Sequence, residues 1–144
     1  MKVYLDNSAL NRPFDDQSFP IIRLETLAVI FILEFIESGD IKMVNSSVIE
    51  YENSKNPFLE RKNWVLSCLL KAKVYQKLNE KIKTRAQGIE KFGIAAIDSL
   101  HLATAEVSTA DYFITCDNEI IKRYKGFLRV NNPVDFIKII KNKL

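Results

Sequence analysis

The amino-acid sequence predicts an α/β fold in which a central parallel sheet is flanked by helices on both faces. Short apolar runs that suit buried strands alternate along the chain with longer segments whose apolar residues recur at helical spacing. With 144 residues the chain is long enough for one core, so we expect a single domain over residues 1–144. Hydrophobic residues make up 47% and charged residues 27% of the chain, as in ordinary globular proteins.

The chain starts with the apolar run KVYLD at residues 2–6, which we expect to be a buried strand that ends on Asp6. A loop containing Pro13 follows, and Pro20 marks the first turn of a helix. The remaining elements that we expect are a strand at 41–44, a helix after 45–47, helices at 58–70, 74–89 and 95–108, a strand at 111–115, a helix at 118–124, a strand at 127–130 and a helix from Pro133.

Local signals support several of these boundaries. The run Asn45-Ser46-Ser47 offers good N-caps for the helix after the second strand, and Asn56-Pro57 stops that helix. The helix predicted at 74–89 rests on apolar residues at helical spacing, namely Val74, Leu78, Ile82, Ala86 and Ile89.

The chain lacks the sequence signs of export, so we expect a cytoplasmic protein. The apolar run after Met1 is too short for a signal peptide, and no stretch reaches the ~18 uncharged apolar residues that a membrane span needs. The two cysteines, Cys68 and Cys116, have no paired spacing for zinc or redox chemistry, which suits buried thiols in a reducing compartment.

The basic residues are concentrated in one part of the chain. The formal net charge is +3, yet residues 60–91 contain nine basic and three acidic residues, so the rest of the chain is net acidic by three. A basic helical region of this kind can neutralise the phosphates of a nucleic acid, although a solvated helix face is an equally good interpretation.

Acidic residues follow three of the predicted strands or lie close to them. Asp6 ends the first strand, Glu50 and Glu52 lie on the helix that follows the second, and Asp117 follows the strand at 111–115. Asp98 lies near the start of the Ala-rich helix. Because ligands of parallel α/β sheets bind beyond the carboxyl ends of the strands, these acids are expected to converge on one edge.

Clustered carboxylates repel one another unless a cation lies among them, and oxygen ligands favour hard divalent ions such as Mg²⁺. Such an ion can activate a water for phosphodiester hydrolysis. Each acid also has a structural interpretation: Asp6 as the cap of the next loop, Asp98 as a helix N-cap, and Asp117 as a turn or cap residue. For Asp15 and Asp16, in the Pro-containing loop, a solvated role is favoured.

Four segments together resemble the motifs of the PIN-domain family, in the same order and at comparable spacing, over nearly the whole chain. They are VYLDNSALNRPF, SSVIEYENSKNP, AAIDSLHLATA and DYFITCDNEIIKR. The resemblance implies a PIN domain over residues 1–144 and a Mg²⁺- or Mn²⁺-dependent ribonuclease. Many members of this family are VapC-type toxins paired with an antitoxin, and homodimers are common among them.

Matched to the family motifs, Asp6, Asp98 and Asp117 are the implied metal ligands, and with Glu52 they form the implied catalytic set. Glu50 is the alternative second acid, but it lies about 200° from Glu52 around a helix, so both cannot face one ion. Next to these acids, Ser8 and Thr115 match positions where the family often has hydroxyls. His101 is one helical turn beyond Asp98, and we favour a packing role for it over that of a catalytic base. Trp64 and the phenylalanines are interpreted as core residues.

The function predicted from these observations is a metal-dependent endoribonuclease acting on RNA phosphodiester bonds, with a toxin role and an antitoxin partner as the more specific form. The basic helices at 60–91 would hold the RNA backbone. The alternative is a catalytically inert PIN-like module that binds RNA or another protein, and a nuclease acting on DNA would share the same site.

Overall fold

The computed structural model describes residues 1–142, and within them the chain forms one five-stranded sheet in which every strand pairing is parallel. The central strand β1 (Lys2–Leu5) lies between β2 (Lys42–Ser46) and β4 (Tyr112–Ile114). The edges are formed by β3 (Val74–Gln76) and β5 (Arg129–Asn131). The predicted α/β class with a parallel sheet is therefore confirmed. The last two residues of the expected domain lie outside the described part of the chain.

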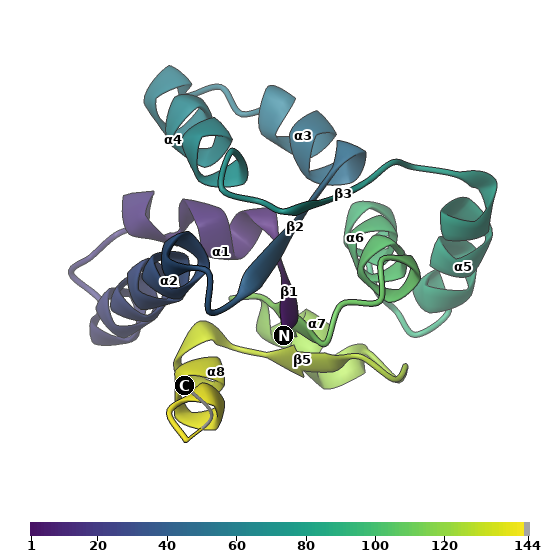
Figure 1. Ribbon diagram of the computed structural model, residues 1–144. Coiled ribbons are helices and arrows are strands. Elements are labelled where there is room, and N and C mark those ends of the chain that lie inside the picture. Colours follow the sequence, from purple (N-terminus) through teal and green to yellow (C-terminus); the bar gives the residue numbers. More distant parts are fainter. Residues whose placement is uncertain (143–144) are drawn as a thin grey trace.

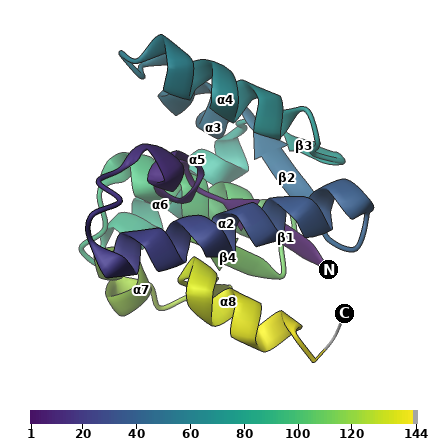
Figure 2. The ribbon, with the colours of Figure 1, turned by 90° about the vertical axis from the view of Figure 1, so that its left-hand side faces the viewer.

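Helices cover both faces of this sheet. Figure 1 shows α1, α2 and α8 on one side and α5, α6 and α7 on the other, with α3 and α4 beyond β2 and β3. Figure 2 shows that α2 and α8 lie side by side. The helices are α1 (Asn7–Asn11), α2 (Pro20–Ser38), α3 (Ser47–Ser54), α4 (Leu59–Leu69), α5 (Glu80–Glu90), α6 (Ala96–Val107), α7 (Asn118–Arg123) and α8 (Pro133–Ile140), with a 3₁₀ turn at Arg12–Phe14.

The core explains why these segments adopt these conformations. Val3, Tyr4 and Leu5 of β1 are all buried, as expected of a central strand that is covered on both faces. Pro20 lies in the first turn of α2, where its missing N–H costs no hydrogen bond, and the helix ends at Gly39 with a left-handed φ of +91°. Within the described residues, no helix is long and apolar enough to cross a membrane.

The prediction of a helix at 74–89 is wrong for the first residues of this range. Residues 74–76 form strand β3, which pairs with β2, and the helix starts only at Glu80. The spacing of Val74 and Leu78 suits a helix, but the available strand partner and the β-favouring Val74-Tyr75 pair outweigh that spacing. The side chain of Asn79 accepts a hydrogen bond from the amide of Ile82 and so marks the true start of α5.

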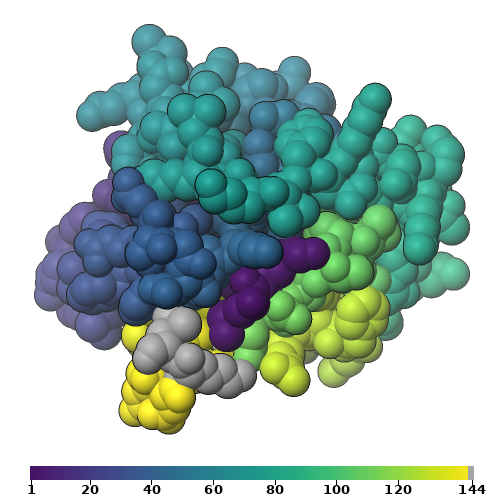
Figure 3. All heavy atoms as spheres, viewed as in Figure 1, coloured from purple at the N-terminus to yellow at the C-terminus, as the bar shows by residue number. Residues whose placement is uncertain are grey.

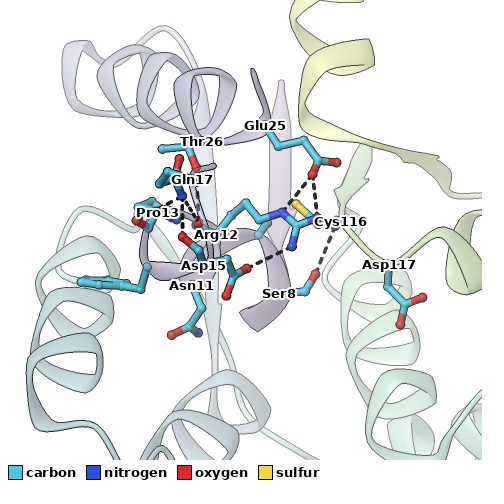
Figure 4. Close-up of polar contacts among 12 residues, drawn as sticks. Ser8, Asn11, Arg12, Pro13, Asp15, Gln17, Glu25, Thr26, Cys116 and Asp117 are labelled. Atoms are coloured by element: carbon cyan, nitrogen blue, oxygen red, sulfur yellow. Dashed lines mark hydrogen bonds and ion pairs between the residues drawn. The ribbon is translucent and has the colours of Figure 1, made fainter. Parts of the chain in front are cut away.

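A buried ion pair fastens the first loop to the rest of the fold (Figure 4). The Glu25 side chain on α2 is buried and accepts hydrogen bonds from Arg12 Nε at 2.9 Å and Arg12 Nη2 at 2.7 Å. The Asn132 amide at the start of α8 donates to the other oxygen of Glu25. Arg12 also pairs with Asp15 at 3.0 Å. These bonds connect the 3₁₀ turn, α2 and α8 around one carboxylate.

Replacing Arg12 with Ala is expected to lower the free energy of unfolding by about 3 kcal/mol, because it leaves the buried Glu25 carboxylate without its cation. Urea denaturation of the purified protein measures this loss. The matched control is Arg123→Ala, which removes an exposed ion pair with Glu119 and should cost less than about 1 kcal/mol. Equal losses for both variants would show that the buried pair does not anchor the loop.

Candidate active site

The candidate site lies where the strands end. Asp6 directly follows β1, Ser46 is the last residue of β2, and Thr115 directly follows β4. Since all strands are parallel, these residues share one edge of the sheet. Strand β1 begins close to the N-terminus at the opposite edge of the sheet, on the side of the molecule that Figure 3 shows.

Asp6 is 3% exposed, and both of its carboxylate oxygens accept hydrogen bonds. The Ser8 hydroxyl at 2.7 Å and the Ala9 amide at 3.0 Å donate to Oδ1, and the Thr115 hydroxyl at 2.6 Å donates to Oδ2. Burial raises the pKa of Asp6, and these three hydrogen bonds oppose that rise. Asp6 is also the N-cap of α1, so the capping interpretation describes part of its role.

Asp98 lies in the first turn of α6, but the N-cap of that helix is Ala95, so a purely capping role for Asp98 is wrong. Its pKa is raised to about 6, first by burial and then by the negative charge of Asp6, with smaller contributions from Asp117 and Glu52. His101 opposes this shift. The charges of the three other predicted acids therefore all act on Asp98, although burial is the main cause of its raised pKa.

Asp117 is the N-cap of α7, where its carboxylate accepts a hydrogen bond from the Glu119 amide at 2.9 Å. Asp117 and Asp98 line the same hollow of about 300 Å³, together with Arg123. In Figure 4 the Asp117 side chain extends away from the Arg12 ion pair. The second oxygen of Asp117 accepts no hydrogen bond among the described residues and is therefore available to a ligand.

Glu52 is held by a chain of buried hydrogen bonds. His101 is 0% exposed, and its Nε2 lies 2.8 Å from Glu52 Oε1, while its Nδ1 lies 2.7 Å from the hydroxyl of Tyr4. The Tyr4 hydroxyl is in turn 2.9 Å from the Ser46 hydroxyl, which accepts from the Ile49 amide. With a neutral imidazole, each hydroxyl or N–H donates to the next group, and the chain ends on the Glu52 carboxylate.

Glu50, the alternative second acid, lies on the other side of α3. Its carboxylate accepts hydrogen bonds from Asn45 at 3.2 Å and from the Tyr75 hydroxyl at 3.0 Å, at an exposed position. The charge of Glu50 does not contribute to the raised pKa of Asp98, whereas that of Glu52 does. The structure therefore favours Glu52 over Glu50 as the second acid of the site.

The donor chemistry of this site fits a hard divalent cation, because every candidate ligand is a carboxylate oxygen. Among residues 1–142, however, no three His, Cys, Asp or Glu side chains lie close enough together to hold a metal ion by themselves. A Mg²⁺ site does not need three protein ligands, because this ion usually takes one or two carboxylates together with waters.

Sequence reasoning missed the Tyr4–His101–Glu52 chain and the buried Glu25. Tyr4 alternates with Asp6 along β1 and so shares a face with it, which was a usable signal. Glu25 lies three and four residues before Ala28 and Val29 on the buried face of α2, and this spacing was also visible in the sequence.

No protein-family model matches the sequence, and no curated protein matches it. The fold is similar to solved structures. One is FitAcB from Neisseria gonorrhoeae, with a TM-score of 0.60 and 18% identity over 91% of this chain and 97% of that one. Another is VapBC2 from Rickettsia felis bound to a DNA fragment from their promoter, with a TM-score of 0.55 and 17% identity over 92% of this chain and 98% of that one. At these identities the similarity shows a PIN-like fold.

Replacing Asp98 with Asn is expected to stabilise the protein at pH 7 in metal-free buffer by about 1–2 kcal/mol, since one pKa unit corresponds to about 1.4 kcal/mol and solvent screens part of it. The folded state binds the Asp98 proton more tightly than the unfolded state, so the wild type loses this stability as the pH rises from about 4 to about 6. The advantage of the variant should therefore vanish below about pH 4.

Urea denaturation at several pH values measures this difference. Asp135→Asn, which changes an exposed acid on α8, serves as the control and should alter stability little at any pH. A destabilised D98N protein at pH 7 would contradict the raised pKa of Asp98.

Proposed function

We propose that the protein is a Mg²⁺- or Mn²⁺-dependent endoribonuclease that hydrolyses RNA phosphodiester bonds. The observation that carries this proposal is the gathering of acids at the carboxyl edge of a parallel sheet, where Asp6 follows β1 and Asp98 and Asp117 line one hollow. The raised pKa of Asp98, caused first by burial and then by the charge of Asp6, agrees with this arrangement. Such a cluster is unfavourable in the free protein and becomes favourable when a cation neutralises it. The resemblance of the sequence to PIN-domain ribonucleases supports the same reaction.

In this proposal Asp6, Asp98 and Asp117 hold the ion directly or through water. When bound, the ion supplies a water of lowered pKa and stabilises the charge on the phosphate. Glu52 orients the attacking water or completes the site, and the buried Tyr4–His101 chain keeps its carboxylate in place. Ser8 and Thr115 fix the rotamer of Asp6.

The basic region at 60–91 supports RNA binding only in part, because several of its cations are used within the fold. Arg85 pairs with the buried Glu106, Lys71 with Glu37 and Lys83 with Glu80. Among the described residues, no ion pair involves Lys77 or Lys81, which lie near the start of α5. These two lysines are the better candidates for contacts with the RNA backbone.

The wild-type protein is expected to cleave single-stranded RNA with Mn²⁺ or Mg²⁺ and to be inactive with EDTA. D98N and D6N should each reduce the cleavage rate at least ~100-fold, because each removes a ligand charge, while Asp135→Asn should cleave normally. A labelled-RNA digestion, run beside a single-stranded DNA of the same sequence, measures these rates.

Full activity of D6N would refute the assigned site. An inert PIN-like module, the competing proposal, would bind no Mn²⁺ at millimolar concentration and would cleave neither nucleic acid.

A toxin role with an antitoxin partner is the more specific form of this proposal. Its support is the similarity to VapBC2 together with the resemblance of the sequence to VapC-type toxins. An exposed apolar face on α2 supports a protein partner; its residues are Ile21, Leu24, Leu27 and Phe31. An exposed helical stripe of this kind is typical of protein-binding surfaces.

Induced expression in a bacterial host is expected to arrest growth, and D98N should relieve the arrest because it removes the cleavage activity. Co-expression of the product of the neighbouring upstream gene should restore growth to cells that make the wild type. Replacing Leu24 and Phe31 with Glu should abolish that rescue if α2 binds the partner. Colony counts after induction measure each result, and equal growth of wild type and D98N would contradict the toxin role.

A further inference from the structure

A groove of about 510 Å³ lies beside the candidate active site and has no role in the function proposed above. Its wall is mostly apolar and is built from α3, from β3 with the loop after it, and from α6 (Figure 1). The apolar and aromatic residues that line it are Val48, Tyr51, Tyr75, Leu78, Ile97 and Leu100.

The groove and the acidic site are built on the same two helices, α3 and α6. On α3, Tyr51 directly precedes Glu52; on α6, Ile97 directly precedes Asp98 and Leu100 directly precedes His101. The His101–Glu52 hydrogen bond connects these two helices at 2.8 Å. The groove and the acids are therefore connected by neighbouring residues on α3 and α6.

Two tyrosines give the groove an aromatic surface that is open to solvent. Tyr51 is 59% exposed and Tyr75 is 54% exposed, so both rings are accessible to a ligand. The Tyr75 hydroxyl donates to Glu50 at 3.0 Å, so the orientation of its ring is fixed before any ligand arrives. Preorganised rings of this kind bind ligands with little loss of side-chain entropy.

The charges around the groove favour a ligand that carries phosphate. Lys77 lines the groove, and the Lys55 ammonium lies 5.3 Å from the centroid of the Tyr51 ring. The carboxylate of Glu50 is engaged by Asn45 and Tyr75. Aromatic rings next to lysines, beside a site for phosphodiester chemistry, match the way in which single-stranded nucleic acids are bound.

We infer that this groove binds an unpaired nucleobase of the RNA strand, stacked against Tyr51 or Tyr75, while the adjoining phosphodiester lies at the acids. This inference rests on the proposed nuclease function for the identity of its ligand. In this inference α3 has two roles, because Glu52 supports the reaction and the neighbouring Tyr51 contacts a base. It also implies cleavage of single strands, because a paired base cannot enter the groove.

The test measures binding of a fluorescein-labelled six-nucleotide oligouridylate in EDTA, where no cleavage occurs. Replacing Tyr51 and Tyr75 together with Ala is expected to weaken binding about tenfold, since base stacking on an aromatic residue is worth ~1–3 kcal/mol. Replacing both with Phe keeps the rings but removes the Tyr75–Glu50 hydrogen bond, so it should weaken binding much less than the Ala replacement. Phe127→Ala removes an aromatic side chain that is 73% exposed and lies outside the groove, and it should have no effect.

A second probe with the same backbone but no bases separates stacking from charge. Wild type and the double Ala variant should bind it equally. Equal binding of the uridylate by the wild type and the double Ala variant would overturn the inference. A wild-type dimer that the double Ala variant disrupts, as measured by light scattering, would also overturn it. If the wild type cleaves no RNA but base-dependent binding persists, the nuclease proposal fails and the groove stands. If cleavage occurs with an unchanged KM in the double Ala variant, the groove fails alone.

Discussion

The buried carboxylate of Asp6 is the constraint around which the candidate site is organised. A carboxylate removed from water is costly unless hydrogen bonds replace its hydration, and here three donors do so. The donors connect it further: the Ser8 hydroxyl accepts from the Cys116 amide at 3.1 Å, and the Thr115 hydroxyl accepts from the Asp117 amide at 3.0 Å. The ends of β1 and β4 are therefore fixed relative to each other, and with them the backbone of Asp117.

A second buried network starts two residues earlier on the same strand. Tyr4 and Asp6 share one face of the extended chain, and the Tyr4 hydroxyl leads through His101 to Glu52. Burial raises the pKa of the Tyr4 hydroxyl well above its usual range, so the hydroxyl is a neutral donor at pH 7. Strand β1 thus helps to position two further acids. Asp6 at its end fixes the backbone of Asp117 through Thr115, and Tyr4 holds the side chain of Glu52 through His101.

Features that follow from a local pattern in the sequence were predictable, whereas features that depend on contacts with distant residues were not. Strand β1 and Asp6 at its end follow from a short apolar run that stops at an acid. Strand β3 was missed because three residues carry too little pattern to compete with helical spacing at Val74 and Leu78, and only pairing with β2 decides between them. His101 was expected to pack, and it does lie in the core, but its two hydrogen bonds join residues 97 and 49 positions away. No local signal reports such contacts.

The distribution of cations supports the electrostatic argument for the site. The chain has 21 Lys and Arg residues, and its buried acids outside the site are paired with them: Glu25 with Arg12, and Glu106 with Arg85. Among residues 1–142, no Lys or Arg forms an ion pair with Asp6, Glu52, Asp98 or Asp117. A fold selected only for stability would gain by pairing these four acids with cations in the same way. Each unpaired carboxylate makes ionisation of a neighbouring carboxyl group less favourable. Under the proposed function, a bound cation would stabilise the Asp98 carboxylate, whose charge is made unfavourable by burial and by the neighbouring acids.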